Sequence, residues 1–165
     1  MIKKISIPVL SLFLFSISAS AFSGNVNFSG EWILDKEKTE LTESPLYLSK
    51  IKISQEENGM QTTRTYTNQY GEQYPFDEEI TVEGEEKEIV IYEMKRRTSA
   101  RWSEDGKSLI INSITKYWGD SGEEEFIIEE RLSLDKTGKI LSIEYASDSV
   151  WGKDTGTNFY KISEE

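Results

Sequence analysis

The side chains that could carry chemistry in this sequence are carboxylates, guanidinium groups and aromatic rings, because it contains no histidine and no cysteine. That composition excludes Ser-His-Asp and Cys-His catalysis, disulfides, and zinc or haem sites built on those ligands. We therefore expect no catalytic residue, no metal site and no cofactor. The enzymatic alternative is a carboxylate-based hydrolase, which needs two acids about 5–10 Å apart in a cleft.

Two carboxylates share the alternation of apolar residues in their own segments. Glu130 follows the parity of a run of Phe, Ile and Leu, and Glu93 follows the parity of two isoleucines. A carboxylate on an apolar face must be paired, protonated or hydrated. Each is either a polar centre or general acid facing a ligand, or one half of a buried Glu–Arg pair. The basic residues on nearby predicted strands that would neutralise them are Arg64, Arg97 and Arg101.

Aromatic side chains are plentiful, with four Trp, eight Tyr and seven Phe. If several of them face one interior, they line a cavity for a flat apolar or sugar-like ligand, and the Tyr hydroxyls add direction. The alternative is an ordinary packed core. The cavity interpretation, combined with the charged residues expected to face inward, predicts a ligand-binding set of Arg64, Tyr66, Tyr92, Arg101, Trp102, Tyr117, Glu130 and Tyr145.

The net charge of −11 argues against nucleic acid or anionic lipid as a partner, because both require a basic face. The one basic cluster lies between Tyr92 and Arg101. It either receives a carboxylate or phosphate, for which Arg offers a bidentate fork, or balances the acidic run of residues 83–88 across a hairpin. No protein partner is indicated.

The elements that must position these residues are strands, because apolar and polar residues alternate with a period of two along most of the chain. Gly-containing turns separate the strands, so neighbours in sequence pair as an antiparallel meander. About ten such strands close or nearly close into an all-β up-and-down barrel, which removes exposed edges. The predicted strands are 28–34, 47–55, 60–67, 76–82, 88–94, 96–103, 108–118, 124–134, 139–147 and 156–162.

Residues 1–21 are typical of a secretory signal peptide, with Lys3 and Lys4 before an apolar run and an Ala-Ser-Ala cleavage pattern. Cleavage after Ala21 leaves 144 residues with a net charge of −13, and we expect residues 22–165 to form a single barrel domain. We expect no membrane span in this mature chain. The protein is therefore predicted to be exported and bacterial, located in the periplasm, at the outer envelope or outside the cell.

The first strand pattern of the mature chain, Phe28-Ser29-Gly30-Glu31-Trp32-Ile33-Leu34-Asp35, resembles the Gly-x-Trp opening of lipocalins and their bacterial lipocalin-like relatives. The resemblance extends over the mature chain by strand count and order. It implies structural roles for Gly30 and Trp32, with the ring of Trp32 closing one barrel end. It also implies a cation–π cap on that ring, for which Lys161 is the first candidate and Arg131 the second. The chain differs from a typical lipocalin in lacking a helical pattern before its last strand.

Taken together, the sequence predicts an exported lipocalin-like barrel that binds a small, partly apolar ligand in its lumen. The alternative is a structural or protein-interaction module of the bacterial cell envelope, with a barrel filled by side chains and no ligand. An outer-membrane barrel is disfavoured because charges occur on both parities of the strands.

Overall fold

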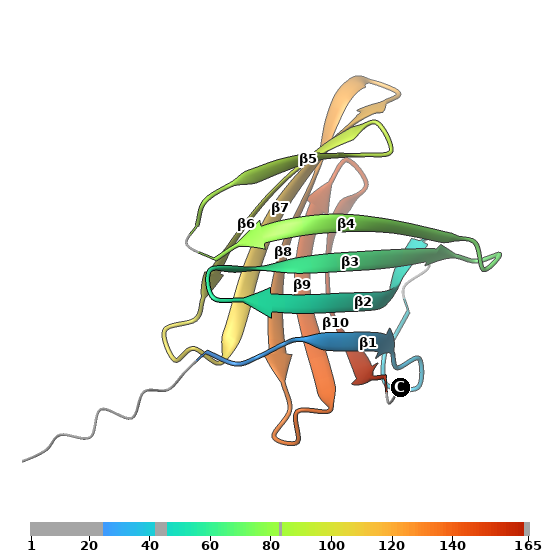
Figure 1. Ribbon diagram of the computed structural model, residues 1–165. Helices are drawn as coiled ribbons and strands as arrows, with labels where there is room; N and C mark the ends of the chain where they lie inside the picture. Colours follow the sequence, from blue (N-terminus) through green and yellow to red (C-terminus); the bar gives the residue numbers. More distant parts are fainter. Residues whose placement is uncertain (1–24, 42–45, 83, 164–165) are drawn as a thin grey trace, which may run out of the picture.

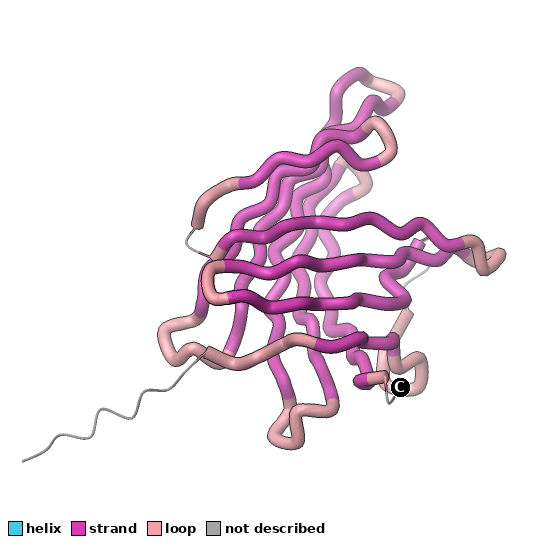
Figure 2. The backbone as a smooth tube through the Cα atoms, viewed as in Figure 1, coloured by secondary structure: helices cyan, strands magenta, loops and turns pink. Residues whose placement is uncertain are grey.

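The computed structural model describes residues 25–41, 46–82 and 84–163, which form one antiparallel sheet of ten strands. The predicted signal peptide, residues 1–21, lies outside the described residues. Figure 2 shows strands joined by short turns throughout this part of the chain. The prediction of an all-β fold is confirmed.

Each of the ten predicted strands is present, with boundaries shifted by a few residues. The largest shift is in the last strand, which begins at Gly152 and not at residue 156. The strands are β1 (Gly30–Leu34), β2 (Leu46–Glu56), β3 (Gly59–Asn68), β4 (Gln73–Thr81), β5 (Lys87–Ile91), β6 (Met94–Trp102), β7 (Ser108–Gly119), β8 (Gly122–Leu134), β9 (Ile140–Ser149) and β10 (Gly152–Ile162).

The strand order in the sheet is β4-β3-β2-β1-β10-β9-β8-β7-β6-β5, so strands that follow one another in sequence pair in space. The pairing of β1 with β10 joins the two ends of the chain, with Trp32 opposite Ile162. In Figure 1, β1 to β4 pass in front of β6 to β10 at a steep angle and the sheet curls around its interior. The molecule is a nearly closed up-and-down barrel.

β4 and β5 are the two edge strands of the sheet and form no backbone ladder with each other, so the barrel is open along a seam between them. Side chains bridge this seam instead. The Tyr92 hydroxyl donates to the Pro75 carbonyl at 2.8 Å. The Arg96 Nε donates to Glu78 at 2.9 Å, and the Thr98 hydroxyl donates to the same carboxylate. These contacts close the barrel without the cooperative hydrogen bonds of a strand pair.

One end of the barrel is filled by aromatic side chains. Trp32 is only 1% exposed, and its indole N–H donates to the Phe28 carbonyl at 2.9 Å. Phe28 stacks on Trp102 with ring centroids 5.9 Å apart. Gly30 has a φ of +148°, and a Cβ there would lie 3.3 Å from the Ile162 side chain. Gly30 and Trp32 therefore pack where the first strand meets the last.

The predicted cation–π cap on Trp32 is wrong. The Lys161 Nζ lies 3.0 Å from the Asp35 Oδ2, on the outside of the strand pair. In the part of the chain that the structure describes, the cation–π contacts are Lys36 over Tyr47 and Arg96 over Phe76. Lys161 has the opposite parity to the buried Tyr160, so its side chain points away from the interior that contains Trp32.

The predicted inward position of Glu93 is also wrong. We expected a strand over 88–94, but β5 ends at Ile91, and Tyr92 and Glu93 form the turn that follows. Both have positive φ values, 46° and 70°. The alternation of apolar residues continues to residue 91 and then stops, so parity cannot be extended through the turn.

Candidate ligand-binding cavity

A cavity of about 410 Å³ occupies the barrel interior at the end formed by the β1–β2 loop and the β9–β10 turn. Its walls come mainly from β2, β3, β8, β9 and β10. The aliphatic wall includes Leu34, Leu48, Ile128 and Ile143, and the aromatic wall includes Tyr47, Tyr66, Phe126, Tyr145, Trp151 and Tyr160. Trp151, which is 80% exposed, lies at the mouth. Glu40, Glu130, Asp154 and Asn158 add polar groups to these walls.

At the buried side of the cavity, Glu130 on β8 is held by Arg64 on β3. The Arg64 Nη1 and Nη2 donate to the two Glu130 oxygens at 2.9 and 2.8 Å. Both residues are buried, at 2% and 4% exposure. The prediction that Arg64 neutralises Glu130 is confirmed. Because both carboxylate oxygens already accept a charged hydrogen bond, this is a bidentate pair of the strong kind.

The Arg64–Glu130 pair continues into a second buried pair toward the seam. The Arg64 Nε lies 3.8 Å from the Glu78 carboxylate, which in turn accepts the hydrogen bond of Arg96. Two carboxylates and two guanidinium groups thus balance in the interior. Burying charge is tolerable only when it is paired in this way.

Burial by itself raises the pKa of Glu130, but the charge of Arg64 and its two hydrogen bonds outweigh that effect, so the pKa lies below its ordinary value. Glu130 is therefore ionised at neutral pH. A general acid needs the opposite shift. The geometry of this carboxylate suits a fixed polar anchor and not proton donation.

Three of the predicted ligand-binding residues line the cavity directly: Tyr66, Glu130 and Tyr145. Arg64 lies behind Glu130 and contacts it as described above. Tyr117 does not line the cavity itself. It stacks on the cavity residue Trp151, with ring centroids 5.7 Å apart. The structure thus gathers five of the eight predicted residues at or next to one cavity.

The other three predicted residues lie elsewhere. Tyr92 is 58% exposed in the β5–β6 turn, where it bridges the seam. Arg101 is exposed on β6, between the inward-facing Ala100 and Trp102. Trp102 packs on Phe28 at the filled end of the barrel. The described residues that line the cavity include none from β5, β6 or the turn between them, so these three side chains lie outside it.

The basic cluster predicted between Tyr92 and Arg101 does not act as one unit. Arg96 turns inward to Glu78, whereas Arg97 pairs with Glu86 at 3.1 Å on the exposed side of the β5–β6 hairpin. For Arg97, the cross-hairpin interpretation is confirmed.

Asp154 and Asn158 on β10 are cavity residues that sequence reasoning missed. They share the inward parity of Tyr160, together with Gly152 and Gly156. The sequence carries no apolar alternation there, because residues 152–158 are glycine and polar residues, so the inward positions become evident only from the strand in the structure. Gly156 also makes room: a Cβ there would lie 2.8 Å from the Tyr145 hydroxyl oxygen, which donates to Asp154 at 3.1 Å.

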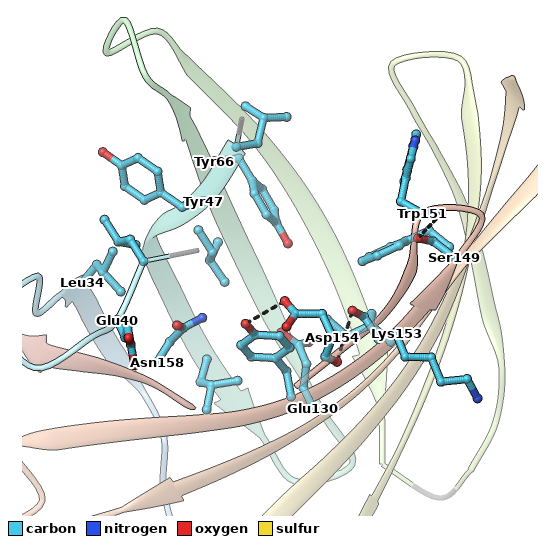
Figure 3. Close-up of a pocket in the computed structure, with 18 of the residues that line it drawn as sticks. Leu34, Glu40, Tyr47, Tyr66, Glu130, Ser149, Trp151, Lys153, Asp154 and Asn158 are labelled. Carbon is cyan, nitrogen blue, oxygen red and sulfur yellow. Dashed lines mark hydrogen bonds between the residues drawn. The ribbon is translucent and has the colours of Figure 1, made fainter. Parts of the chain in front are cut away.

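Figure 3 shows Asp154, Glu130 and Tyr66 among the residues around this cavity, with Trp151 at one side. Burial and the hydrogen bond to Asp154 both raise the pKa of the Tyr145 hydroxyl, so it stays protonated and keeps donating. The site thus has apolar and aromatic walls with one buried, fixed carboxylate, Glu130, and one exposed carboxylate, Asp154.

No model of a known protein family matches this chain, and a search of curated proteins finds no match either. Among residues 25–41, 46–82 and 84–163, no three potential metal ligands of the His, Cys, Asp or Glu types gather in one place. Over the same ranges, no helix is long and apolar enough to cross a membrane.

Proposed function

We propose that this protein is an exported, lipocalin-like barrel that binds a small, partly apolar ligand in its lumen. The observation that carries the proposal is the cavity of about 410 Å³ with aliphatic and aromatic walls and few polar groups. Sites for small molecules typically have this size and character. The Gly-x-Trp strand and the meander order support the likeness to lipocalins.

The charges at the cavity favour binding over catalysis. Glu130 is locked by Arg64 and ionised, so it positions a ligand without exchanging a proton. The walls of the site are formed mainly by strands, which hold side chains more rigidly than loops do. The signal peptide predicted over residues 1–21 and the acidic charge of the remaining sequence support a role in the periplasm, at the outer envelope or outside the cell.

Two exposed tryptophans favour a second candidate, a protein-interaction module of the cell envelope. Trp118 and Trp151 are 83% and 80% exposed at the ends of neighbouring hairpins. Exposed apolar side chains that gather into a contiguous patch mark interaction sites. This candidate does not require the cavity to be occupied, so binding in the cavity decides between the two.

The test is binding of the neutral fluorescent probe N-phenyl-1-naphthylamine, read as an increase in its emission. Ser147 lines the cavity on β9, and Ser142 lies on the opposite face of the same strand. We expect Ser147→Phe to fill the cavity and abolish the increase, and Ser142→Phe to leave it intact. Equal probe emission with wild type and Ser147→Phe would overturn the proposal.

A further inference from the structure

Among the described residues that line the cavity, no basic side chain is free to pair with an acidic ligand. Arg64 is the nearest guanidinium, and both of its terminal nitrogens already bind Glu130. Lys153 also borders the cavity, but its amine is paired with Asp148 at 3.2 Å and its side chain is 81% exposed. A ligand carboxylate or phosphate would have to break one of these pairs or reach out to the exposed Lys36 amine, which donates to the Tyr47 hydroxyl at 3.0 Å.

The carboxylate of Asp154, by contrast, is available to pair with a cationic ligand. It faces the interior from β10, and the group that binds it is the neutral Tyr145 hydroxyl, at 3.1 Å. No basic side chain of the described ranges pairs with it. Glu40, at the mouth of the cavity, likewise has no basic partner in those ranges. The exposed Lys36 amine at Tyr47 offsets one of these two carboxylates, so the unbalanced charge at the cavity is negative.

The cavity walls also suit a cation. Tyr66, Tyr145 and Tyr160 contribute aromatic rings, and the faces of such rings attract positive charge. Two rings already do so within this protein: the Lys36 amine lies 5.1 Å from the centroid of Tyr47, and Arg96 lies 5.8 Å from that of Phe76. Tyr160 is buried and Tyr66 and Tyr145 are half-buried, and partial exclusion of water strengthens this attraction.

We propose that the ligand of this cavity is an organic cation, an amine or quaternary ammonium group carried on an apolar body, with Asp154 as its counter-ion. The apolar body packs against the leucine and isoleucine wall, and the cationic head lies between Asp154 and the tyrosine rings. The overall charge of −11 favours the approach of such a ligand. This inference rests on the proposed function, because it specifies the chemistry of the same site.

The experiment compares three ligands with the same eight-carbon chain: octyltrimethylammonium, 1-octanol and octanoate. Each is titrated against wild-type protein loaded with N-phenyl-1-naphthylamine, at one salt concentration. We expect octyltrimethylammonium to displace the probe at a concentration about tenfold lower than octanoate. With Asp154→Asn, the ammonium ligand should weaken about fivefold or more, whereas 1-octanol should be unaffected.

Asp77→Asn is the matched control. Asp77 is exposed on β4, outside the cavity, and like Asp154 its carboxylate accepts a hydroxyl hydrogen bond, in this case from Thr63. The control loses the same charge, so ammonium binding should stay at the wild-type level. If the probe binds but octanoate or 1-octanol displaces it as well as the ammonium ligand does, the cation inference is overturned and the binding function stands. If the probe does not bind, both fail.

Discussion

Arg64 and Glu130, 66 positions apart in the sequence, form a bidentate ion pair across the interior of the barrel. The pair ties β3 to β8, two strands that share no backbone ladder. It closes one side of the cavity and keeps the Arg64 guanidinium from pairing with a ligand. Stability and ligand chemistry thus depend on the same contact.

Breaking this pair from one side should be costly. Arg64→Met leaves a buried carboxylate without its partner, and we expect a loss of about 3–5 kcal/mol in the free energy of unfolding. Replacing both residues, Arg64→Met with Glu130→Leu, should recover most of that loss because no uncompensated charge remains. Urea denaturation measures both. Arg97→Met, at an exposed pair with Glu86, should cost less than about 1 kcal/mol; a similar cost at both arginines would contradict the assignment.

The same pair predicts a dependence of stability on pH. The pKa of Glu130 is lower in the folded protein than in the unfolded chain, so its ionised form stabilises the fold at pH values above its unfolded pKa. This contribution decreases as the pH falls through the unfolded pKa toward the folded pKa, and it is absent below both. Urea titrations between pH 7 and pH 3 should therefore show a shallower acid decline for Glu130→Gln than for wild type. Glu129→Gln, its outward-facing neighbour, should keep the wild-type decline, and identical curves for both variants would exclude this role for Glu130.

Trp32 should be central to stability. Its indole is 1% exposed and donates to Phe28, so Trp32→Ala should lower the free energy of unfolding by about 3–5 kcal/mol. Trp118, at 83% exposure, provides the same substitution without burial, and Trp118→Ala should change stability by no more than about 0.5 kcal/mol. Thermal and urea unfolding of the two variants make the comparison. A Trp32→Ala protein that unfolds like wild type would refute the structural role of the Gly-x-Trp strand.

The β5–β6 turn stores backbone strain that a glycine should relieve. Glu93 has a φ of 70°, a conformation that costs non-glycine residues roughly 1–2 kcal/mol. We expect Glu93→Gly to raise the free energy of unfolding by about 0.5–1 kcal/mol, measured by urea denaturation. Glu129→Gly, within β8, should instead lower it by roughly 0.5–1 kcal/mol because glycine is unfavourable inside a strand. A loss at both sites would show that the turn is not strained.

Several features of this protein follow from its sequence alone. The period of two and the Gly-containing turns predict ten strands in meander order, because alternation and turn chemistry are local properties. The same parity places Glu130 and Tyr145 inside. Parity predicts the direction of a side chain only within a strand, so the sequence placed Glu93 wrongly because β5 ends at Ile91. For the same reason, Asp154 is assigned to the interior only when the last strand begins at Gly152.

Tertiary structure alone decided which inward groups meet. Arg64 reaches Glu130 across the barrel, Tyr92 bridges the seam to Pro75, and Trp102 packs at the end opposite the cavity. These outcomes depend on strand tilt and on the level of each side chain along the barrel axis, which alternation along a single strand does not encode. Because Arg64 pairs with Glu130 across the interior, the cavity carboxylates that have no basic partner within the described ranges are Asp154 and Glu40.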